Sequence, residues 1–163
     1  MTLMLPFVLI LAAMDAKTQV ALEKDVISTI AGPAEITFVG HGSLMISFQD
    51  KIIHIDPYSK MTDYAVLPKA DLILITHEHG DHVRGLDVLA RRLNVPIHAT
   101  AGTLHDFLHH RRTSDKPIDH HACRYHERFE VGDFLIEPFA TSHDAAEPCG
   151  FIIREPSPVR ARP

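Results

Sequence analysis

Residues 76–82 read Thr76-His77-Glu78-His79-Gly80-Asp81-His82, and this stretch decides how the chain is interpreted. An apolar run, Asp71-Leu72-Ile73-Leu74-Ile75-Thr76, leads directly into it. An uninterrupted run of this length is typical of a short strand that is buried on both faces. The polar stretch is therefore expected in a loop at the carboxyl end of a buried strand.

Three imidazoles and one carboxylate are crowded into this loop. Side chains repeat every second residue in an extended segment, so His77 and His79 point the same way and can bind one ion. After the turn at Gly80, Asp81 and His82 can face a second ion or a water molecule. The competing interpretation is a solvated loop in which Asp81 caps the next helix, but it leaves three histidines unexplained. We therefore predict that His77, His79, Asp81 and His82 are metal ligands.

The composition sets limits on the class of protein. A chain of 163 residues with 45% apolar and 23% charged residues is typical of one globular domain. Its net charge of −5 provides no overall positive field for nucleic acid, so a nucleic-acid substrate would need a local patch. The 13 histidines favour metal chemistry. Cys123 and Cys149 lie too far apart in the sequence for a zinc ribbon or a Cys-x-x-Cys redox motif.

Short blocks of β-forming residues follow the break at Gly32-Pro33 and predict an opening antiparallel meander. Its strands are expected at residues 36–39, 44–48 and 52–55. Apolar residues at helical spacing then predict a helix over residues 83–93. The remaining expected elements are a strand at 97–99, a helix at 103–110, a hairpin over 129–137 that turns at Gly132-Asp133, and a strand at 150–154.

The two ends are expected outside the folded domain of residues 31–155. Residues 1–30 are interpreted as an apolar N-terminal segment and a linker, in which residues 15–29 are polar and compatible with a helix, so that the ordered sheet begins near Glu35. Residues 114–124 are expected as a polar surface excursion, and residues 156–163 as a disordered tail.

The apolar run from Leu3 to Met14 has the length of a signal-peptide core and is too short to span a membrane. No basic residue precedes it, which argues against a signal. A periplasmic or secreted location and a cytoplasmic one therefore stay equally open, and no stable membrane insertion is expected.

The pattern His-x-His-x-Asp-His after an apolar strand resembles the signature of the metallo-β-lactamase superfamily. The resemblance implies an α/β fold, the αββα sandwich of two packed sheets with helices outside. It also implies that Asp56 orients the first metal-binding histidine through an outer hydrogen bond, and that His143 completes the first metal site. The residues alone leave an alternative for each, because Asp56 precedes a proline as turn residues do and His143 can be a surface histidine.

The resemblance covers residues 35–154 and divides between two branches of the superfamily. Residues 35–82, with Gly40-His41-Gly42-Ser43, resemble the UlaG-like hydrolases. Residues from Leu86 onward, including Ser142-His143-Asp144, resemble the YycJ-type exonucleases. This division favours a recombinant of the two branches.

Members of the superfamily continue into a second half, which supplies a bridging Asp and a final His for the second ion. We therefore expect only the first half of the sandwich here, with Asp81 and His82 alone at the second metal site. One half alone leaves the inner face of its sheet in water, an apolar patch larger than monomers usually expose. A homodimer that pairs these faces is the expected result.

An ion at this site would act as a Lewis acid and lower the pKa of its water ligand toward neutrality. Asp81 is the expected catalytic residue, because it can hold and orient that water. Ligands without thiolate suit zinc, with manganese or iron as alternatives, and one or two ions are expected. The expected reaction is hydrolysis of a phosphodiester or ester in a small molecule or nucleic acid. The alternatives are a lactonase and a catalytically silent metal-binding fragment that self-associates.

Two other histidine-containing segments are less informative. His120-His121-Ala122-Cys123 with His126 is interpreted as a solvated loop rather than a site for a soft ion. His41 lies between two glycines, and it is either at the mouth of the active site or an ordinary turn residue.

Overall fold

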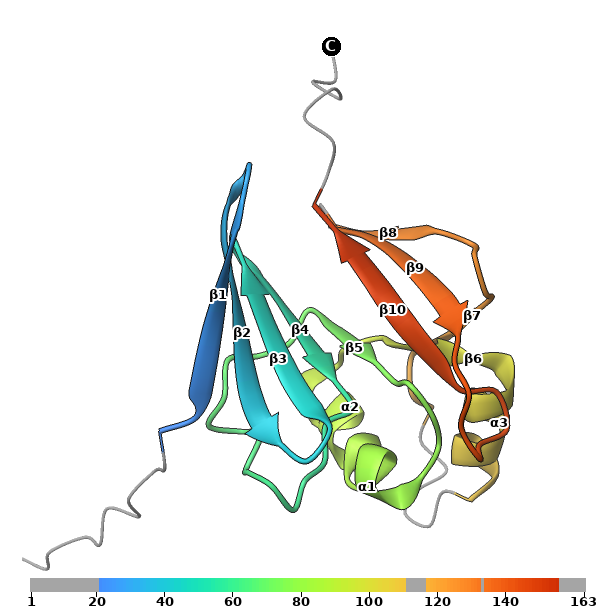
Figure 1. The fold of residues 1–163 in the computed structure, drawn as a ribbon. Helices are drawn as coiled ribbons and strands as arrows, with labels where there is room; N and C mark the ends of the chain where they lie inside the picture. The colour runs from blue at the N-terminus through green and yellow to red at the C-terminus, as the bar shows by residue number, and fades with distance from the viewer. Residues whose placement is uncertain (1–20, 111–116, 133, 156–163) are drawn as a thin grey trace, which may run out of the picture.

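The computed structural model describes residues 21–110, 117–132 and 134–155. Within them, helices cover one face of a larger sheet and a smaller sheet covers part of the other (Figure 1). The larger sheet contains β1 (Glu23–Thr29), β2 (Gly32–Gly40), β3 (Ser43–Phe48), β4 (Lys51–Ile55), β5 (Leu72–Leu74), β6 (Ile97–Thr100) and β7 (His120–Cys123). The smaller sheet contains β8 (Phe129–Val131), β9 (Phe134–Ala140) and β10 (Cys149–Arg154), and the helices are α1 (Gly80–Val83), α2 (Leu86–Leu93) and α3 (Ala101–His109).

The larger sheet contains the predicted meander, because β2, β3 and β4 pair antiparallel in chain order. From β4 onward the pairing becomes parallel, through β5 and β6 to β7. Parallel neighbours need crossover connections, which α1 and α2 provide between β5 and β6, and α3 between β6 and β7. The predicted α/β class is confirmed.

Strand β5 lies between β4 and β6 and is buried on both faces, as its apolar sequence predicts. Ile73 faces the helices and belongs to the same core as Leu86 of α2. Leu72 and Leu74 face the smaller sheet. Since both faces are packed, the carboxyl end of β5 is held firmly where residues 75–82 leave the sheet.

The smaller sheet packs on the inner face of the larger one. Phe134 and Ile136 of β9 are buried in one cluster with Phe48 and Leu72. The expectation that the inner face lies bare is therefore wrong in this region, because the predicted hairpin β8–β9 and strand β10 cover it. The turn begins at Gly132 with a φ of +57°, as predicted, and Asp133 lies outside the described residues.

Exposed apolar side chains remain at the other end of the larger sheet. Val26 and Ile27 of the edge strand β1 are 56% and 52% exposed, and Phe38 of β2 is also exposed. A groove of about 150 Å³ runs between these strands and β10. Ile27, Ile36 and Ile153 are among the residues that line it.

The helix predicted over residues 83–93 forms only as α2, from Leu86 onward. Val83 is the last residue of α1, and Gly85, whose φ is +92°, lies between the two helices. A side chain at Gly85 would collide with Ser59, whose hydroxyl donates to the Arg84 carbonyl at 3.0 Å. Helix α3 begins earlier than predicted, because the hydroxyl of Thr100 accepts from the Thr103 amide and caps its first turn.

Two segments differ from the sequence-based expectation. Residues 23–29 form strand β1 rather than helix, and residues 120–123 form β7 within the expected surface excursion. Both are edge strands with mostly exposed side chains, so neither carries the apolar alternation that reveals a half-buried strand. The sheet therefore begins at Glu23 instead of near Glu35.

The expectations for the apolar run at residues 3–14, the helix over residues 15–20 and the tail at 156–163 lie outside the described residues. None of the helices that the structure describes is long and apolar enough to cross a membrane.

Candidate metal centre

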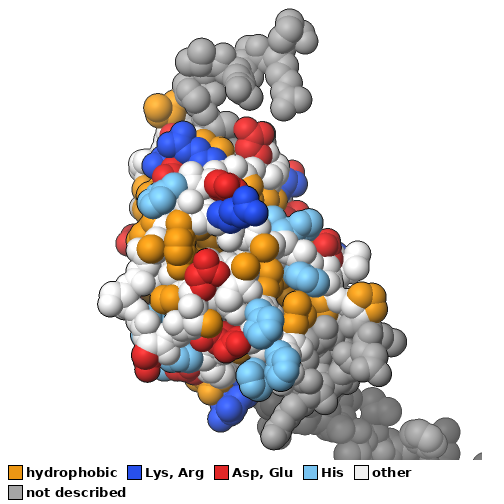
Figure 2. All heavy atoms as spheres, turned by 90° about the vertical axis from the view of Figure 1, so that its right-hand side faces the viewer, with side chains coloured by type: hydrophobic (Ala, Val, Ile, Leu, Met, Phe, Trp, Pro, Cys, Tyr) orange, Lys and Arg blue, Asp and Glu red, His pale blue; other side chains and the backbone are white. Residues whose placement is uncertain are grey.

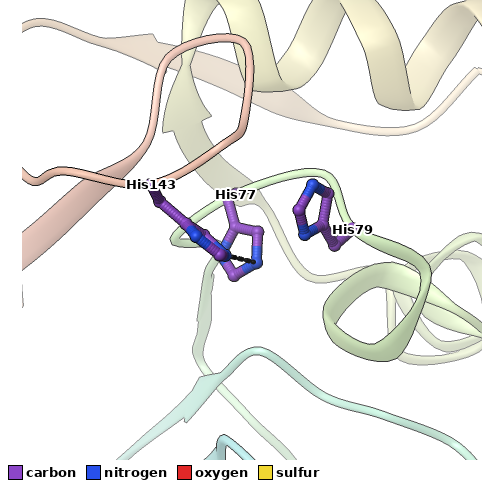
Figure 3. Close-up of side chains that lie close together, drawn as sticks. All are labelled: His77, His79 and His143. Carbon is purple, nitrogen blue, oxygen red and sulfur yellow. Dashed lines mark hydrogen bonds between the residues drawn. The ribbon is translucent and has the colours of Figure 1, made fainter.

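Three histidines from two distant loops converge beyond the carboxyl end of β5. His77 and His79 lie in the loop that follows β5, and His143 lies in the loop between β9 and β10. Figure 3 shows the rings of His77 and His143 directed at one another, with His79 beside them. The Nε2 atoms of His77 and His143 are 3.1 Å apart, and one donor nitrogen from each of the three histidines lies within 4.8 Å of the others.

The chemistry of this cluster fits a metal ion. Zinc–nitrogen bonds of about 2.0–2.1 Å place two tetrahedral ligands roughly 3.3 Å apart, close to the observed separation of His77 and His143. Burial, with the neighbouring imidazoles of His82, His143 and His79, lowers the pKa of His77. A low pKa favours the neutral ring, which is the form that binds a metal.

Outer hydrogen bonds hold two of these rings with Nε2 directed into the cluster. The Nδ1 atom of His77 lies 2.9 Å from the hydroxyl of Thr76, and Nδ1 of His143 lies 2.9 Å from the carboxylate of Asp144. In His79 the Nε2 atom instead contacts the Asp144 carbonyl at 3.0 Å, which leaves Nδ1 free. Such outer partners orient metal-binding imidazoles in known sites.

Asp56 lies beneath the cluster with a left-handed backbone, at a φ of +46°. Its buried carboxylate accepts from the amide and the hydroxyl of Thr76, at 2.8 and 2.6 Å, and lies 3.0 Å from Nδ1 of His82. The imidazole that Asp56 contacts directly is thus that of His82, whereas the family resemblance led us to expect His77. Its link to His77 runs through the Thr76 hydroxyl. Asp56 also raises the pKa of His82 through this contact, against the opposing effect of burial.

Asp81 and His82 lie on α1, directly after the histidine loop. Asp81 occupies the first turn of α1, whereas the N-cap position is taken by His79. The carboxylate of Asp81 lies 2.6 Å from Nε2 of His41, which comes from the turn between β2 and β3. The hydrogen bond from His41 lowers the pKa of Asp81 and keeps this carboxylate ionised. His41 therefore lies at the candidate site. This agrees with the first of its two interpretations, a residue at the mouth of the site rather than an ordinary turn residue.

Two glutamates that the sequence analysis left without a role position the His143 loop. The carboxylate of Glu78 accepts from the Ala146 amide at 2.7 Å. The carboxylate of Glu147 accepts from the Gly102 amide at 2.7 Å, so the loop is also held at the first turn of α3. Each of these contacts joins residues more than 40 positions apart in the sequence, so no local pattern predicts it.

The histidines of β7 and α3 lie elsewhere. Their side chains are exposed. Figure 2 shows that several histidine side chains lie on one face of the molecule. Within residues 21–110, 117–132 and 134–155, three groups of side chains are close enough together to bind a metal ion. None of these groups contains His120, His121, Cys123 or His126. Burial raises the pKa of Cys123 to about 12, which disfavours the thiolate that a soft ion needs.

Comparison with known proteins places these features in a family context. A family model described as the beta-lactamase superfamily domain matches residues 50–160. A UPF0173 metal-dependent hydrolase from Thermococcus kodakarensis is 30% identical over 130 residues, which are 74% of this chain and 56% of the relative. The exodeoxyribonuclease YycJ from Bacillus anthracis is 40% identical over 82 residues, which are 47% of this chain and 28% of the relative. The chain spans about half the length, or less, of these curated relatives.

Among solved structures, the Rm3 metallo-beta-lactamase superposes with a TM-score of 0.59 at 20% identity, over 78% of this chain and 55% of that one. At this identity the likeness shows the fold alone, and it confirms the predicted metallo-β-lactamase fold. The match to the Thermococcus protein covers 130 residues. This is longer than either of the two segments, residues 35–82 and residues 86–154, that resemble different branches, so a single relative matches parts of both segments.

Proposed function

This chain belongs to the beta-lactamase superfamily, and on that basis we propose that it is a metal-dependent hydrolase that cleaves phosphodiester bonds. The observation that carries the proposal is the convergence of His77, His79 and His143, which bring one donor nitrogen each to within 4.8 Å of the others. Three histidines are a common protein ligand set for a catalytic zinc, which keeps a further position for water or substrate.

A divalent ion held by these three histidines supplies Lewis acidity and a nucleophilic water molecule at neutral pH. Nitrogen ligands without thiolate suit zinc, with manganese and iron as the alternatives. In this proposal the carboxylate of Asp81 orients the attacking water. The hydrogen bond from His41 holds the Asp81 carboxylate in place and lowers its pKa, which favours a role in orienting the water over one in accepting a proton.

Two observations favour a phosphodiester over another ester. The relative with 40% identity is named an exodeoxyribonuclease, and its match covers about half of this chain. In addition, the exposed guanidinium of Arg84 lies beside Gly80, 3.7 Å from where a Cβ of that residue would lie. A cation beside Gly80, the residue that separates His79 from Asp81 in the sequence, can bind a phosphate oxygen and supply a local positive charge in a chain of net charge −5.

The test compares the parent protein with Asp81→Ala and His77→Ala on bis-p-nitrophenyl phosphate and single-stranded DNA. Asp81→Ala should lower kcat by about 100-fold or more while the ion at His77, His79 and His143 stays bound, because Asp81 does not belong to that group of three ligands. His77→Ala should lose metal and activity together. The control, His105→Gln, changes an exposed histidine of α3 away from the site and should behave as the parent.

Activity that persists in Asp81→Ala would refute the assigned role of Asp81. A parent protein that binds metal but hydrolyses neither substrate, nor a lactone, would instead support a silent metal-binding fragment.

We further propose that two copies associate through the edge strand β1. Val26 and Ile27 are exposed on this strand, and one edge of it has no partner strand among the described residues, so its backbone groups can pair with a second strand. The groove beside β1 adds apolar surface that a second copy would cover.

A further inference from the structure

We propose that Tyr58 and Arg84 form a nucleotide subsite beside the candidate metal centre, in which the ring of Tyr58 stacks on a base and the guanidinium of Arg84 binds a phosphate. This inference rests on the proposed function, since it specifies which phosphodiester the same centre takes. It adds a residue, Tyr58, that no sequence motif singles out. The chain has a net charge of −5, so a nucleic-acid substrate depends on local contacts of this kind.

Ser59 joins the two segments that carry these side chains. Its amide and its hydroxyl both donate to the carbonyl of Arg84, at 3.1 and 3.0 Å. Tyr58 directly precedes Ser59, and its carbonyl accepts from the amide of Met61 at 3.0 Å, which closes a tight turn. The amide of Tyr58 donates to the buried hydroxyl of Ser43 at 3.1 Å. The backbone therefore holds Tyr58 and Arg84 close to one another, as a subsite for two parts of one nucleotide requires.

Tyr58 lies at the edge of the candidate metal centre. Its ring centroid is 5.9 Å from that of His41, whose Nε2 atom lies 2.6 Å from the carboxylate of Asp81. The β2–β3 turn that carries His41 can approach His82 because residue 42 is glycine, and a Cβ there would lie 2.8 Å from Cε1 of His82. Tyr58 is half-buried, so part of its side chain meets the solvent beside the carboxylate that orients the attacking water.

Arg84 lies on the α1 side of the same carboxylate. It follows α1 directly, it is exposed, and one of its terminal nitrogens lies 3.7 Å from where a Cβ of Gly80 would lie. Gly80 precedes Asp81 in the sequence, so a phosphate that reaches Asp81 also comes near this guanidinium. A guanidinium stays charged at neutral pH and binds phosphate oxygens through two parallel hydrogen bonds.

An aromatic ring and a cation together suit a single strand better than a small diester. Proteins that bind single strands combine cations along the backbone with aromatic rings on which the bases stack. Stacking needs a base with a free face, which a single strand offers and the interior of a duplex does not. A diester without a base would use Arg84 alone. The competing explanation is that Tyr58 only packs against His41 and so supports Asp81.

The test measures how two labelled oligonucleotides bind to the metal-free full chain, by fluorescence anisotropy, so that nothing is cleaved during the measurement. One is an oligothymidylate of about ten nucleotides, and the other has the same number of phosphates and no bases. The parent should bind the oligothymidylate more tightly. Tyr58→Leu should weaken that binding by roughly 5- to 100-fold and leave the abasic strand unaffected, because only bases stack. Tyr58→Phe keeps the ring and should bind both strands as the parent does.

Arg84→Gln should weaken the binding of both strands to a similar extent, because both carry phosphates. The salt dependence should also become less steep, by the share of about one phosphate contact. The matched control is Arg124→Gln, which removes the same charge from an exposed arginine in the loop after β7 and should bind as the parent does. If Tyr58→Leu folds poorly, Tyr58→Met replaces it, since methionine fills irregular space and has no aromatic face.

Equal weakening of both strands in Tyr58→Leu would show that Tyr58 only supports its neighbours, and the subsite would be overturned. A parent that binds neither strand at micromolar concentration, or unchanged binding in Tyr58→Leu, would overturn it as well. Failure of the proposed function looks different. The metal-loaded parent would then cleave neither bis-p-nitrophenyl phosphate nor single-stranded DNA, although the metal-free chain binds the oligothymidylate through Tyr58.

Discussion

Buried His54 gives a prediction about stability that can be worked to a magnitude. This residue of β4 is 0% exposed and faces the ring of Tyr64 at a centroid distance of 5.4 Å. Neither ring nitrogen meets a partner at hydrogen-bonding geometry among the described residues, although the Pro68 carbonyl lies near enough to favour the protonated ring. Burial dominates and lowers the pKa of His54 from 6.5 to about 4.

The sign of the effect follows from the lowered pKa. The folded state binds a proton at His54 less readily than the unfolded state does. The contribution of neutral His54 to the free energy of unfolding is therefore fully present above pH 6.5 and is lost as the pH falls toward 4. At about 1.4 kcal/mol per pH unit, the whole difference amounts to about 3 kcal/mol. About 2 kcal/mol of it should appear between roughly pH 7.5 and pH 5.

The assay is urea unfolding of the metal-free protein at these two pH values, with the parent compared with His54→Leu. Leucine has a similar volume and does not titrate, so the variant should lose about 2 kcal/mol less than the parent when the pH is lowered. His105→Gln, a change of an exposed histidine, should keep the pH dependence of the parent. An equal loss in the parent and His54→Leu would show that His54 is not held neutral by burial, and the reasoning would fail.

Two further predictions test the loop and the association. Glu78→Ala removes the acceptor of the Ala146 amide, so the loop that carries His143 loses a support. We expect zinc affinity at the first site to fall about 10- to 100-fold in a calorimetric titration. An unchanged affinity would mean that Glu78 does not position the loop. Ile27→Glu places a charge on the exposed surface of β1, so sedimentation should show the parent as a dimer and this variant as a monomer. A parent that stays monomeric at micromolar concentration would refute the association.

The histidine loop of residues 76–82 could be predicted because its signal is local. His77 and His79 are two residues apart in an extended segment, so their common direction follows from backbone geometry alone. The buried strand before them is recognisable because β5 is packed on both faces and is therefore apolar throughout. His143 is different, because it lies 66 residues from His77 and only the family resemblance connected the two.

The edge strand β1 was not predicted from the sequence, for a physical reason. Strand β1 is exposed along nearly all its length, so its sequence is as polar as a surface helix would be. What makes it a strand is its pairing with β2, from Glu23 opposite Phe38 to Thr29 opposite Gly32. Pairing of this kind depends on a partner strand, and the segment itself carries no sign of it.

The sequence by itself determined the meander and the histidine loop, because periodicity and spacing act over a few residues, and its resemblance to a known family implied the α/β class. The tertiary structure alone decided that Asp56 meets His82 and that His41 reaches Asp81. Those contacts arise where the β2–β3 turn, the end of β4 and α1 come together. Their distances depend on strand register and on the close approach that Gly42 permits, which are properties of the packed sheet and not of any single segment.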